Sequence, residues 1–417
     1  MYSKKFFIDF PSVLLICLPL LLITGPLLSD LAVSLISLIY IFHIIIKKDF
    51  KIFKDRWFQF LIIFWIYLIL NSLINTIYFD SLRISVSYLR FIFFIFAISF
   101  LLSAKNDNLK YFFYCLLSCY LLLIFDSLIQ FFFKENLLGF PLIPGPRLSS
   151  FFGDELILGS YLARLFPLLL GIFILINEKK NSKFINYLLI FIFILFVFII
   201  FLTGERTAFF YFILVNFFLA IALRTYKKLK IYCFSISLLA IVLSVIFNPG
   251  LKDRMVDLTL LELFPVVDGK KKIVIFTDQH TQHYKSAIKI YKDNSLLGIG
   301  VKNFRLVCKE PKYEISEISC STHPHHTYIQ LLTEVGVIGF SFIVFIFFYF
   351  LKFIINILRV KNLSNIFILD TQLCLISCII ISLWPLSPSG NFFNNWLSIV
   401  YYLPAGFILY SLKLKKI

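Results

Sequence analysis

Residues 323–339 read His-Pro-His-His-Thr-Tyr-Ile-Gln-Leu-Leu-Thr-Glu-Val-Gly-Val-Ile-Gly, so a histidine cluster continues directly into an apolar segment. Pro324 suits the first turn of a helix, where its missing N–H is not needed. A helix that begins at this proline would carry five residues on one face: His325, Tyr328, Leu332, Gly336 and Gly339. The two glycines on that face would allow a neighbouring helix to approach closely.

These histidines have two interpretations. For a single histidine, a soluble loop without a function would be the better one. Three histidines within four residues, followed by Glu334 inside the apolar segment, favour a functional site instead. We therefore expect an imidazole at the water boundary of a helix bundle. Glu334 points away from His325 on the expected helix, so we interpret it as a structural partner.

The composition is that of a membrane protein. Of the 417 residues, 60% are hydrophobic, 53 are Phe and only 15% are charged, which lies outside the range of soluble domains. Several apolar runs reach the about 20 residues that cross a bilayer as a helix. Lys4 and Lys5 precede the first run as in a signal peptide, but no small-residue cleavage site follows, so we interpret this run as a retained helix.

The sequence predicts an all-α polytopic membrane protein with about twelve transmembrane helices and one long outer loop that contains helices. The predicted spans cover residues 11–28, 30–46, 57–77, 87–103, 111–133, 155–177, 184–202, 207–223, 231–247, 326–350, 366–384 and 395–412. Nine of these helices fill residues 1–247, the outer loop with short helices spans 248–325, and three helices fill 326–417.

The net charge of +17 reflects the loops rather than a surface for nucleic acid. Lys and Arg concentrate in alternate short loops, around residues 47–56, 105–110, 179–183, 224–230, 352–361 and 413–416. The opposite short loops hold little beyond Arg83, Lys134, Arg147 and Arg206. Because basic residues favour the cytoplasmic side, we expect both termini in the cytoplasm and the long loop outside.

Cys308 and Cys320 share the long outer loop, and they could form a disulfide if that loop faces an oxidising compartment. The other six cysteines lie in apolar runs and are most simply packing residues: Cys17, Cys115, Cys119, Cys233, Cys374 and Cys378. Within the same loop, residues 286–291 have the pattern of an amphipathic helix that ends at residues 292–294.

Arg206 lies in a very short outer turn, residues 203–207 (Thr-Gly-Glu-Arg-Thr), between two spans. A guanidinium held there can bind phosphate through paired N–H groups. A contact of Arg206 with Glu205 or a lipid headgroup is the structural alternative.

Arg147 follows a Pro-Gly-Pro segment and could shape a binding rim or lie in an ordinary loop. Arg164 must face protein or water, and pairing with Glu155 or Asp154 is an alternative there.

The long loop adds further basic residues to the outer surface, namely Arg254, His280, His283, Lys285 and Arg305. Imidazoles suit zinc, and four histidines could be considered as its ligands: His280, His283, His323 and His325. No Cys or carboxylate is spaced with them in a known metal pattern, so the sequence favours no metal. The absence of a phosphate-binding glycine loop argues against an ATP-driven pump.

Three segments resemble the O-antigen ligase and polymerase superfamily, in the order found in that family. The first is the short turn with Arg206, and the second is the helix and glycine turn of residues 284–304. The third is His325-His326 with Gly336-Val337-Ile338-Gly339 further along. Together they cover roughly residues 145–350, within a similar multispan topology.

The resemblance implies a glycosyltransferase at the periplasmic face of the bacterial inner membrane. Its donor would be a glycan linked to undecaprenyl diphosphate, and it would need neither metal nor nucleotide. Ligases transfer the glycan to the lipid A core, whereas polymerases join repeat units. By this resemblance, His325 matches the essential histidine and Arg206 matches an arginine that binds the diphosphate.

The sequence departs from the family pattern at two positions. The catalytic histidine is usually followed by Asn, and here it is followed by His326. Where the periplasmic helix often begins with another essential Arg, this chain has His280, with His283 and Lys285 nearby. The second cationic contact therefore stays open among Lys285, His283 and Arg305.

The expected mechanism follows from the residue types in these segments and from the family resemblance. His325, whose ordinary pKa is about 6.5, would accept the proton of the acceptor hydroxyl. Arg206, helped by other outer cations, would hold the diphosphate as negative charge develops. The expected substrate contacts are Arg147, His280, His283, Lys285, Arg305 and His326.

The single long loop before the histidine helix slightly favours a ligase over a polymerase. A transporter or flippase is the alternative from another class, but paired repeats typical of transporters are not evident.

Overall fold

The computed structural model describes residues 2–75, 79–144, 147–177, 183–267, 270–360 and 365–414. Parts of three predicted cytoplasmic loops, residues 178–182, 361–364 and 415–417, lie outside this range. The elements are α1 (Tyr2–Ile23), α2 (Pro26–Lys47), η1 (Phe50–Lys54), α3 (Arg56–Ile74), α4 (Phe79–Ser87), α5 (Leu89–Ala104), α6 (Asp107–Phe133), η2 (Ser150–Phe152), α7 (Leu158–Ile176), α8 (Lys183–Leu202), α9 (Arg206–Ala222), α10 (Lys227–Phe247), α11 (Pro249–Lys252), η3 (Asp253–Asp257), α12 (Leu258–Leu263), β1 (Val266–Val267), β2 (Lys270–Lys271), α13 (Asp278–Asp293), α14 (Phe304–Val307), α15 (Thr327–Arg359), α16 (Ile366–Ser382) and α17 (Asn395–Leu414).

The helices have the length and composition of membrane spans. Among the described residues, eight are long and apolar enough to cross a bilayer, and a ninth would form if the bent pair Ser235–Phe247 and Pro249–Leu263 is one span. The shorter apolar helices Phe191–Leu202, Arg206–Ala222 and Ile366–Ser382 lie where further spans were expected. The multi-pass helical class is therefore confirmed, while the number of about twelve spans stays a prediction.

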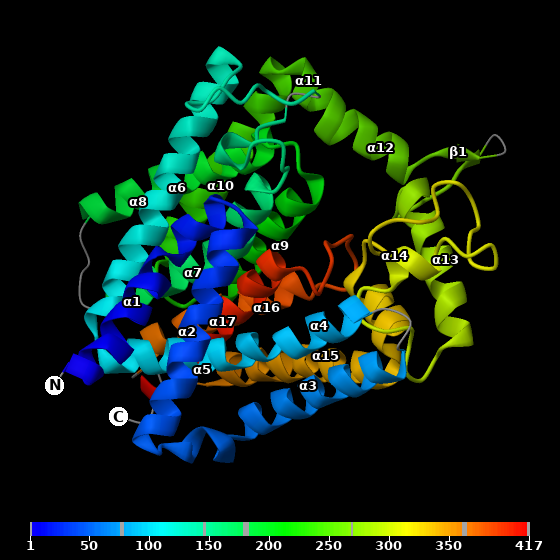
Figure 1. The fold of residues 1–417 in the computed structure, drawn as a ribbon. Coiled ribbons are helices and arrows are strands. Elements are labelled where there is room, and N and C mark those ends of the chain that lie inside the picture. Colours follow the sequence, from blue (N-terminus) through cyan, green and yellow to red (C-terminus); the bar gives the residue numbers. More distant parts are fainter. Residues whose placement is uncertain are drawn as a thin grey trace.

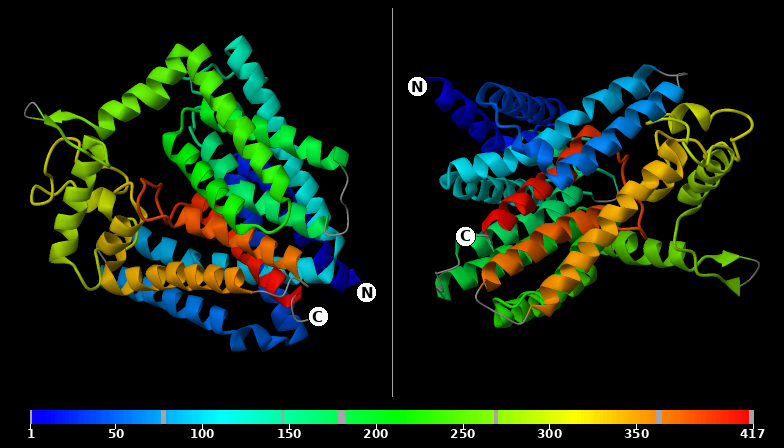
Figure 2. Two further views of the ribbon diagram at one scale, coloured as in Figure 1. Left: turned by 180° about the vertical axis from the view of Figure 1, so that it is seen from behind. Right: turned by 90° about the horizontal axis from the view of Figure 1, so that it is seen from below.

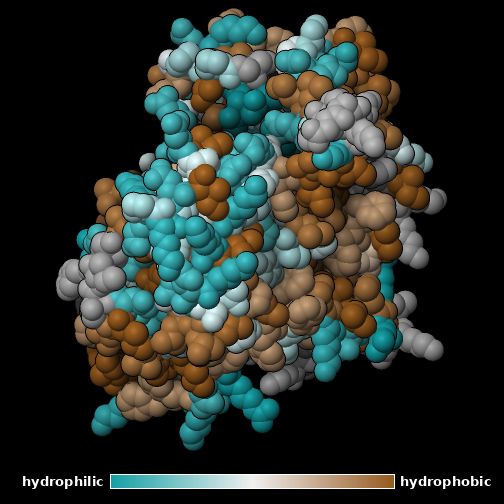
Figure 3. Space-filling view, turned by 90° about the vertical axis from the view of Figure 1, so that its right-hand side faces the viewer, coloured by the Kyte–Doolittle hydropathy of each residue, from teal (hydrophilic) through white to brown (hydrophobic). Residues whose placement is uncertain are grey.

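The molecule has two distinct ends. The start of α1 and the end of α17 lie at one end of the bundle, whereas α13 and α14 lie at the other (Figures 1 and 2). Between these ends α16 packs against α7, and α17 packs against α5. Figure 3 looks at the end that carries α13 and α14, where hydrophilic side chains gather beside hydrophobic flanks. This end is the one that the basic-residue pattern predicts to be outside.

The segment between α10 and α15 has a small core of its own. Ala287, Ile290, Ile299, Phe304 and Val307 are buried together there. The amphipathic helix expected at residues 286–291 is confirmed as part of the longer α13, whose N-cap Thr277 accepts a hydrogen bond from the His280 N–H. One face of α13 packs against α15. The histidines of α13 and those that precede α15 are thereby brought to the same end of the bundle.

The helix start considered at Pro324 is not found, whereas the span predicted from residue 326 agrees closely with the observed helix. Helix α15 begins at Thr327, with His326 as its N-cap, and Pro324 and His325 precede it. His325 has a positive φ of 56°, which ends the regular helical spacing assumed from the sequence. His325 and Gly336 therefore do not share a helix face.

Helix α15 is broken at Gly336, whose φ of 62° and ψ of −175° interrupt the helical backbone. Residues 295–300 cross the break and replace its missing hydrogen bonds. The N–H groups of Ile299 and Gly300 donate to the carbonyls of Thr333 and Glu334, at 3.1 and 2.8 Å. In return, the Val337 N–H donates to the Ser295 carbonyl at 2.9 Å. The two segments thus satisfy each other's backbone groups.

The crossing requires glycine on both sides. Gly298 has a φ of 73°, and a Cβ on it would lie 2.6 Å from the amide nitrogen of Gly336. A Cβ on Gly336 would overlap the Leu296 carbonyl. The close helix approach expected at the glycine pair occurs at Gly339 instead, where a Cβ would lie 2.8 Å from the Tyr67 ring of α3.

Helix α3 completes the hydrogen bonding of the break. The Tyr67 hydroxyl donates to the carbonyl of Val335, and the Asn71 side-chain amide donates to the carbonyl of Leu297. Unpaired backbone groups are costly in the low-dielectric interior of a membrane protein. The break is therefore a built feature, in which groups from α3, α15 and residues 295–300 supply partners for one another.

We expect Gly336→Ala to destabilise the protein far more than Gly139→Ala. Gly139 has a comparable φ of 80° but nothing within 4 Å of an added Cβ, so its substitution costs only the left-handed strain of about 1–2 kcal/mol. At Gly336 the methyl group would also displace residues 295–300, for a total of about 3 kcal/mol or more. Thermal unfolding in detergent measures both variants. Equal midpoints would show that the crossing does not stabilise the fold.

Candidate functional site

Five histidines meet at the N-terminal end of α15. The ring centroid of His325 lies 4.0 Å from that of His323, 5.2 Å from that of His283 and 5.7 Å from that of His280. His326 is the fifth, and its ring contacts Tyr284 of α13 with centroids 5.4 Å apart. The cluster therefore joins both histidines of α13 to the three that precede α15.

His325 is held from several directions. Its carbonyl accepts hydrogen bonds from the Ser389 N–H at 2.9 Å and the Tyr284 hydroxyl at 3.4 Å. Its Nε2 lies 3.0 Å from the Ser321 hydroxyl. The described residues provide no hydrogen-bond partner for its Nδ1. A histidine held at positive φ by such contacts is a frequent feature of functional sites, and here it leaves one ring nitrogen free.

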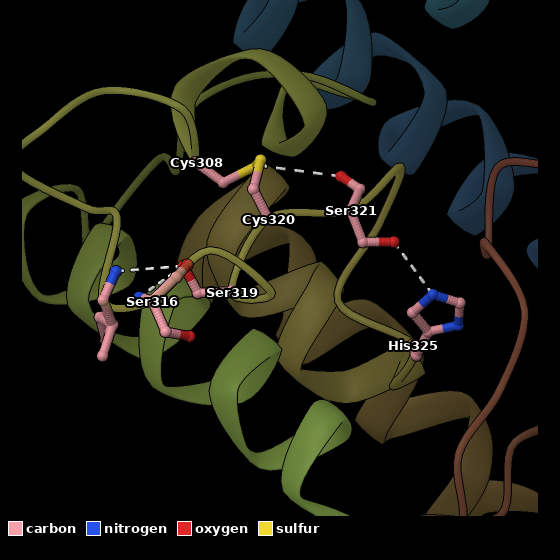
Figure 4. Close-up of a disulfide and its surroundings, with 7 residues drawn as sticks. Cys308, Ser316, Ser319, Cys320, Ser321 and His325 are labelled. Carbon is pink, nitrogen blue, oxygen red and sulfur yellow. Dashed lines mark hydrogen bonds between the residues drawn. A yellow bond between two sulfur atoms is a disulfide. The ribbon is translucent and has the colours of Figure 1, made fainter.

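A disulfide supports the position of Ser321. Cys308 and Cys320 are joined with a Cα–Cα distance of 5.3 Å, and Ser321 follows directly (Figure 4). The Cys308 Sγ also lies 3.8 Å from the Ser321 carbonyl. The hydroxyl of Ser321 points from this bridge towards the His325 ring (Figure 4). The covalent bond thus fixes the segment that contacts His325.

Both ring nitrogens of His326 are used inside the protein. Nε2 lies 3.0 Å from the Pro385 carbonyl, which only accepts, so this nitrogen carries the proton. Nδ1 accepts a hydrogen bond from the Ile329 N–H at 3.4 Å and caps α15. Asn is a preferred N-cap residue, so His326 performs a task that Asn would also perform. It is a structural residue in this arrangement, with no ring nitrogen left for a substrate.

The histidine cluster is electrically neutral at neutral pH. Burial, followed by the charges of His283 and His280, lowers the pKa of His325 from 6.5 to about 4. Burial, followed by the charge of His325, lowers the pKa of His323 to about 3. The pKa values of His280, His283 and His326 are also lowered, in each case chiefly by burial. The cluster can therefore accept protons, but it does not supply a cation.

Cations gather instead around the turn of residues 203–207. Arg206 forms a double ion pair with Glu262 of α12, at 2.7 and 3.1 Å, and not with Glu205 as the alternative proposed. The Arg254 Nε donates to the Gly204 carbonyl at 3.0 Å. Burial and then the charge of Arg254 lower the pKa of Arg147, with Arg206 adding to the effect. Three guanidinium groups therefore share one locality.

Glu205 and Arg164 have other partners than those expected. The Glu205 carboxylate accepts from the N–H groups of Gly159 and Ser160, at 2.7 and 3.2 Å, at the start of α7. Burial raises its pKa to about 7, although these donors oppose the shift. Arg164 stacks on the Tyr211 ring at 4.7 Å and donates from Nε to the Ser160 hydroxyl at 3.1 Å. It does not pair with Asp154 or Glu155.

The arginine group and the histidine cluster are neighbours. The charges of Arg206 and Glu262 both act on the pKa of His280, and the His280 ring contacts His325. Arg305 lies on another side, where its charge contributes to the lowered pKa of His323. Lys285 lies on the exposed face of α13 and is not brought into the cluster. None of the three open candidates for the second cationic contact, Lys285, His283 and Arg305, lies beside Arg206 as a cation.

The polar loop of residues 383–394, between α16 and α17, was not singled out from the sequence. Its Pro385 and Ser389 contact His326 and His325 as described, and the Ser389 hydroxyl lies 2.8 Å from that of Thr327. Asn391 accepts from the Gln330 amide at 3.0 Å. Four polar residues between two apolar helices, Ser387, Ser389, Asn391 and Asn394, were the available signal.

Within the described residues, no group of three or more His, Cys, Asp or Glu side chains has an arrangement that could hold a metal ion. The zinc site weighed from the sequence therefore receives no support from the geometry, although its four histidines are close together.

Residues 190–344 match the family model described as O-antigen ligase. This part of the chain is therefore similar to the O-antigen ligase family. The match contains Arg206, Arg254, the five clustered histidines and the break at Gly336. Arg147, Arg164 and the 383–394 loop lie outside it. A comparison with curated proteins found no match. The match confirms the resemblance to the ligase and polymerase superfamily, without separating its two activities.

We expect Cys308 and Cys320 to resist a membrane-impermeant maleimide until the protein is reduced, because the structure joins their sulfur atoms. Peptide mass spectrometry of intact cells assigns the labelled sites. Cys308→Ser is the matched variant, since it should expose the single thiol of Cys320 without reduction. Labelling of both cysteines in the untreated parent protein would contradict the disulfide.

Proposed function

We propose that this protein transfers a glycan from a polyprenyl diphosphate donor to an acceptor hydroxyl at the periplasmic face of a bacterial inner membrane. The observation that carries the proposal is the free Nδ1 of a neutral His325, held near a group of arginines at the outer end of the bundle. A base beside a diphosphate-binding site suits glycosyl transfer. The O-antigen ligase domain supports the same substrate class.

His325 acts as the base in this proposal. Its Nδ1 takes the proton of the acceptor hydroxyl while the acceptor oxygen forms a bond to the anomeric carbon. The bond from that carbon to the diphosphate oxygen breaks, and the electron pair leaves with the lipid diphosphate. This displacement inverts the anomeric configuration. The products are the extended acceptor, the lipid diphosphate and one proton, which His325 releases to water.

Arg206 binds the departing diphosphate, and we assign the second cation to Arg254. Guanidinium groups bind phosphate oxygens through paired N–H groups and stabilise charge that develops in the transition state. Arg206 and Glu262 are each about one-third exposed, at 34% and 38% of the side chain, so a diphosphate can reach the ion pair and displace the carboxylate. Arg147 adds positive charge to the same locality. His280 and His283 contribute as neutral donors.

The proposed orientation places both termini in the cytoplasm. It rests on the basic residues of the alternate short loops and on the position of α13 and α14 opposite the termini (Figure 1). The donor's lipid tail would lie between spans, with its diphosphate at the outer end. We propose a ligase that uses the lipid A core as acceptor, since one long outer segment precedes α15. A polymerase that joins lipid-linked repeat units is the second candidate.

We expect His325→Ala to lower glycan transfer by about 10²–10⁴-fold, the usual contribution of a general base. His326→Asn is the matched control, because Asn can cap α15 and should keep most of the activity. The assay uses purified protein in detergent with lipid-linked donor and either lipid A core or a second lipid-linked repeat unit. Unchanged transfer by the Ala variant would contradict the role of His325.

The same assay separates the other candidates. Transfer to the lipid A core alone indicates a ligase, and extension of the lipid-linked glycan indicates a polymerase. Because no gradient exists in detergent, transfer there excludes transport as the primary activity. The proposed chemistry uses no metal, so a reaction that stops in EDTA would contradict that part of the mechanism.

The transfer rate should persist in mild acid. The pKa of His325 is lowered to about 4, so the neutral, basic form dominates at every pH above this value. We expect half of the rate to be lost near pH 4, rather than near 6.5 as for an ordinary histidine. The rate is measured in Glu205→Gln protein, which removes a carboxyl that titrates near 7. Loss of half of the transfer rate near pH 6.5 would contradict a buried, neutral base.

The free energy of unfolding should depend on pH, because the pKa of His325 is lower in the folded protein. The unfolded chain binds protons on histidine below pH 6.5, whereas folded His325 binds one only near pH 4. Stability is therefore full above 6.5 and falls as the pH drops through this window. Thermal midpoints of the protein used in the rate assay show whether lost activity at low pH comes from unfolding.

A further inference from the structure

A basic cavity, the second basic site at this end of the molecule, lies near the histidine cluster. It has a volume of about 430 Å³ and is lined by α4, the start of α5, residues 301–306 and the first residue of α17. Arg147, Arg164, Arg206 and Arg254 do not line it. The cavity is therefore separate from the arginine group around residues 203–207.

Four cations and one carboxylate line this cavity: Arg83, Arg90, Lys302, Arg305 and Asp80. Arg83 and Asp80 are 3.4 Å apart, but both side chains are more than two-thirds exposed, at 73% and 78%, so their attraction is weak. Arg90 pairs with Asp30 at 2.7 Å, while its buried Nε has no partner. The cavity thus keeps an excess of positive charge.

Neither Lys302 nor Arg305 is paired directly with an anion in the described part of the chain, although the charges of Glu334 and Asp30 act on Lys302. No hydrogen bond or ion pair holds either side chain among the described residues. Burial and then the charge of Arg305 lower the pKa of Lys302, which shows that the two cations are near each other and partly desolvated. Lys302 also has a positive φ of 60°. A bound anion would offset the repulsion and the lost hydration.

The cavity is connected to the reaction centre through three links. The charge of Arg305 acts on the pKa of His323, whose ring contacts His325. The Cys308–Cys320 disulfide joins the end of α14 to the segment that contacts His325. Asn395 lines the cavity and follows the 383–394 loop, whose Ser389 holds the His325 carbonyl. His325 therefore has a basic site on each of two sides.

We propose that this cavity binds a phosphate group of the acceptor glycolipid. The inference rests on the proposed function, because a transfer between two lipid-anchored substrates needs a place for each anionic head. The arginine group around Arg206 takes the donor diphosphate, so the second cavity takes the phosphate that the acceptor keeps throughout the reaction. Guanidinium and ammonium donors from three separate segments suit a phosphate monoester or diphosphate. No bond to this phosphate forms or breaks.

The test measures binding without turnover, in the Arg206→Ala background, so that the donor site is disabled. The probes are lipid A, lipid A treated with phosphatase, undecaprenyl diphosphate and phosphatidylglycerol, each titrated into purified protein in non-ionic detergent. Lipid A and undecaprenyl diphosphate represent the two kinds of acceptor. Phosphatidylglycerol represents the bulk membrane.

We expect at least one of the two acceptor probes to bind about tenfold or more weakly to the Arg83→Gln/Lys302→Gln variant, the effect of losing charge-assisted contacts. The Arg83→Lys/Lys302→Arg variant should restore binding, which separates lost charge from damaged folding. Lys312→Gln is the matched control, because Lys312 is exposed in the same outer segment and pairs with Asp293 at 2.7 Å. For lipid A, phosphatase treatment should weaken binding to a similar extent.

Equal affinity of both acceptor probes for the parent and Gln variants would overturn the proposal. Binding of phosphatidylglycerol as tight as that of the acceptor probes would also overturn it, since the cavity would then hold a bulk lipid. Failure of the proposed function has a different signature. In that case the parent protein with Arg206 intact transfers no glycan, whatever the binding measurements give.

Discussion

The architecture of the outer end depends on the exchange of backbone hydrogen bonds between the break in α15 and residues 295–300. A helix inside a membrane protein cannot leave carbonyl and N–H groups unpaired without a large cost. Here Gly336 releases such groups, and the turn around Gly298 supplies the partners. The exchange joins the segment after α13 to α15, and with it the two sources of the histidine cluster. The disulfide and the small core around Phe304 then hold the rest of the segment between α13 and α15 in place.

The site separates neutral from charged groups. Burial keeps the histidines neutral, and each additional ring lowers the proton affinity of the others. A guanidinium placed among them would disfavour their protonation further, yet a diphosphate needs guanidinium groups. In the proposed function this conflict is resolved because Arg206, Arg147 and Arg254 lie around the 203–207 turn, where Glu262 pairs with Arg206. The proposed base and the proposed anion site are thus neighbours without sharing a position.

Some of this organisation could be predicted from the sequence and some could not. The helical membrane class, α13 and the candidate pair of His325 and Arg206 follow from hydropathy, periodicity and a family resemblance. The span predicted from residue 326 agrees with the start of α15, whereas the start considered at Pro324 is not found, because His326 offers a side-chain cap two residues later. Periodicity also cannot reveal the break at Gly336, since a glycine in a helical pattern serves equally for close packing. At Gly339 it does serve that purpose.

The groups that were missed lie far from the histidines in sequence. Arg254 was noted only as part of a basic surface, because its contact with Gly204 exists only after α10 bends into α11. The 383–394 loop has no charged residue and carries no motif, although it holds the carbonyl of His325 and the ring of His326. Its hydrogen bonds to His325 and His326 account for a short polar segment between two buried apolar helices. Backbone groups and small hydroxyls can hold the base in place without adding a charge, and an added charge would change its proton affinity.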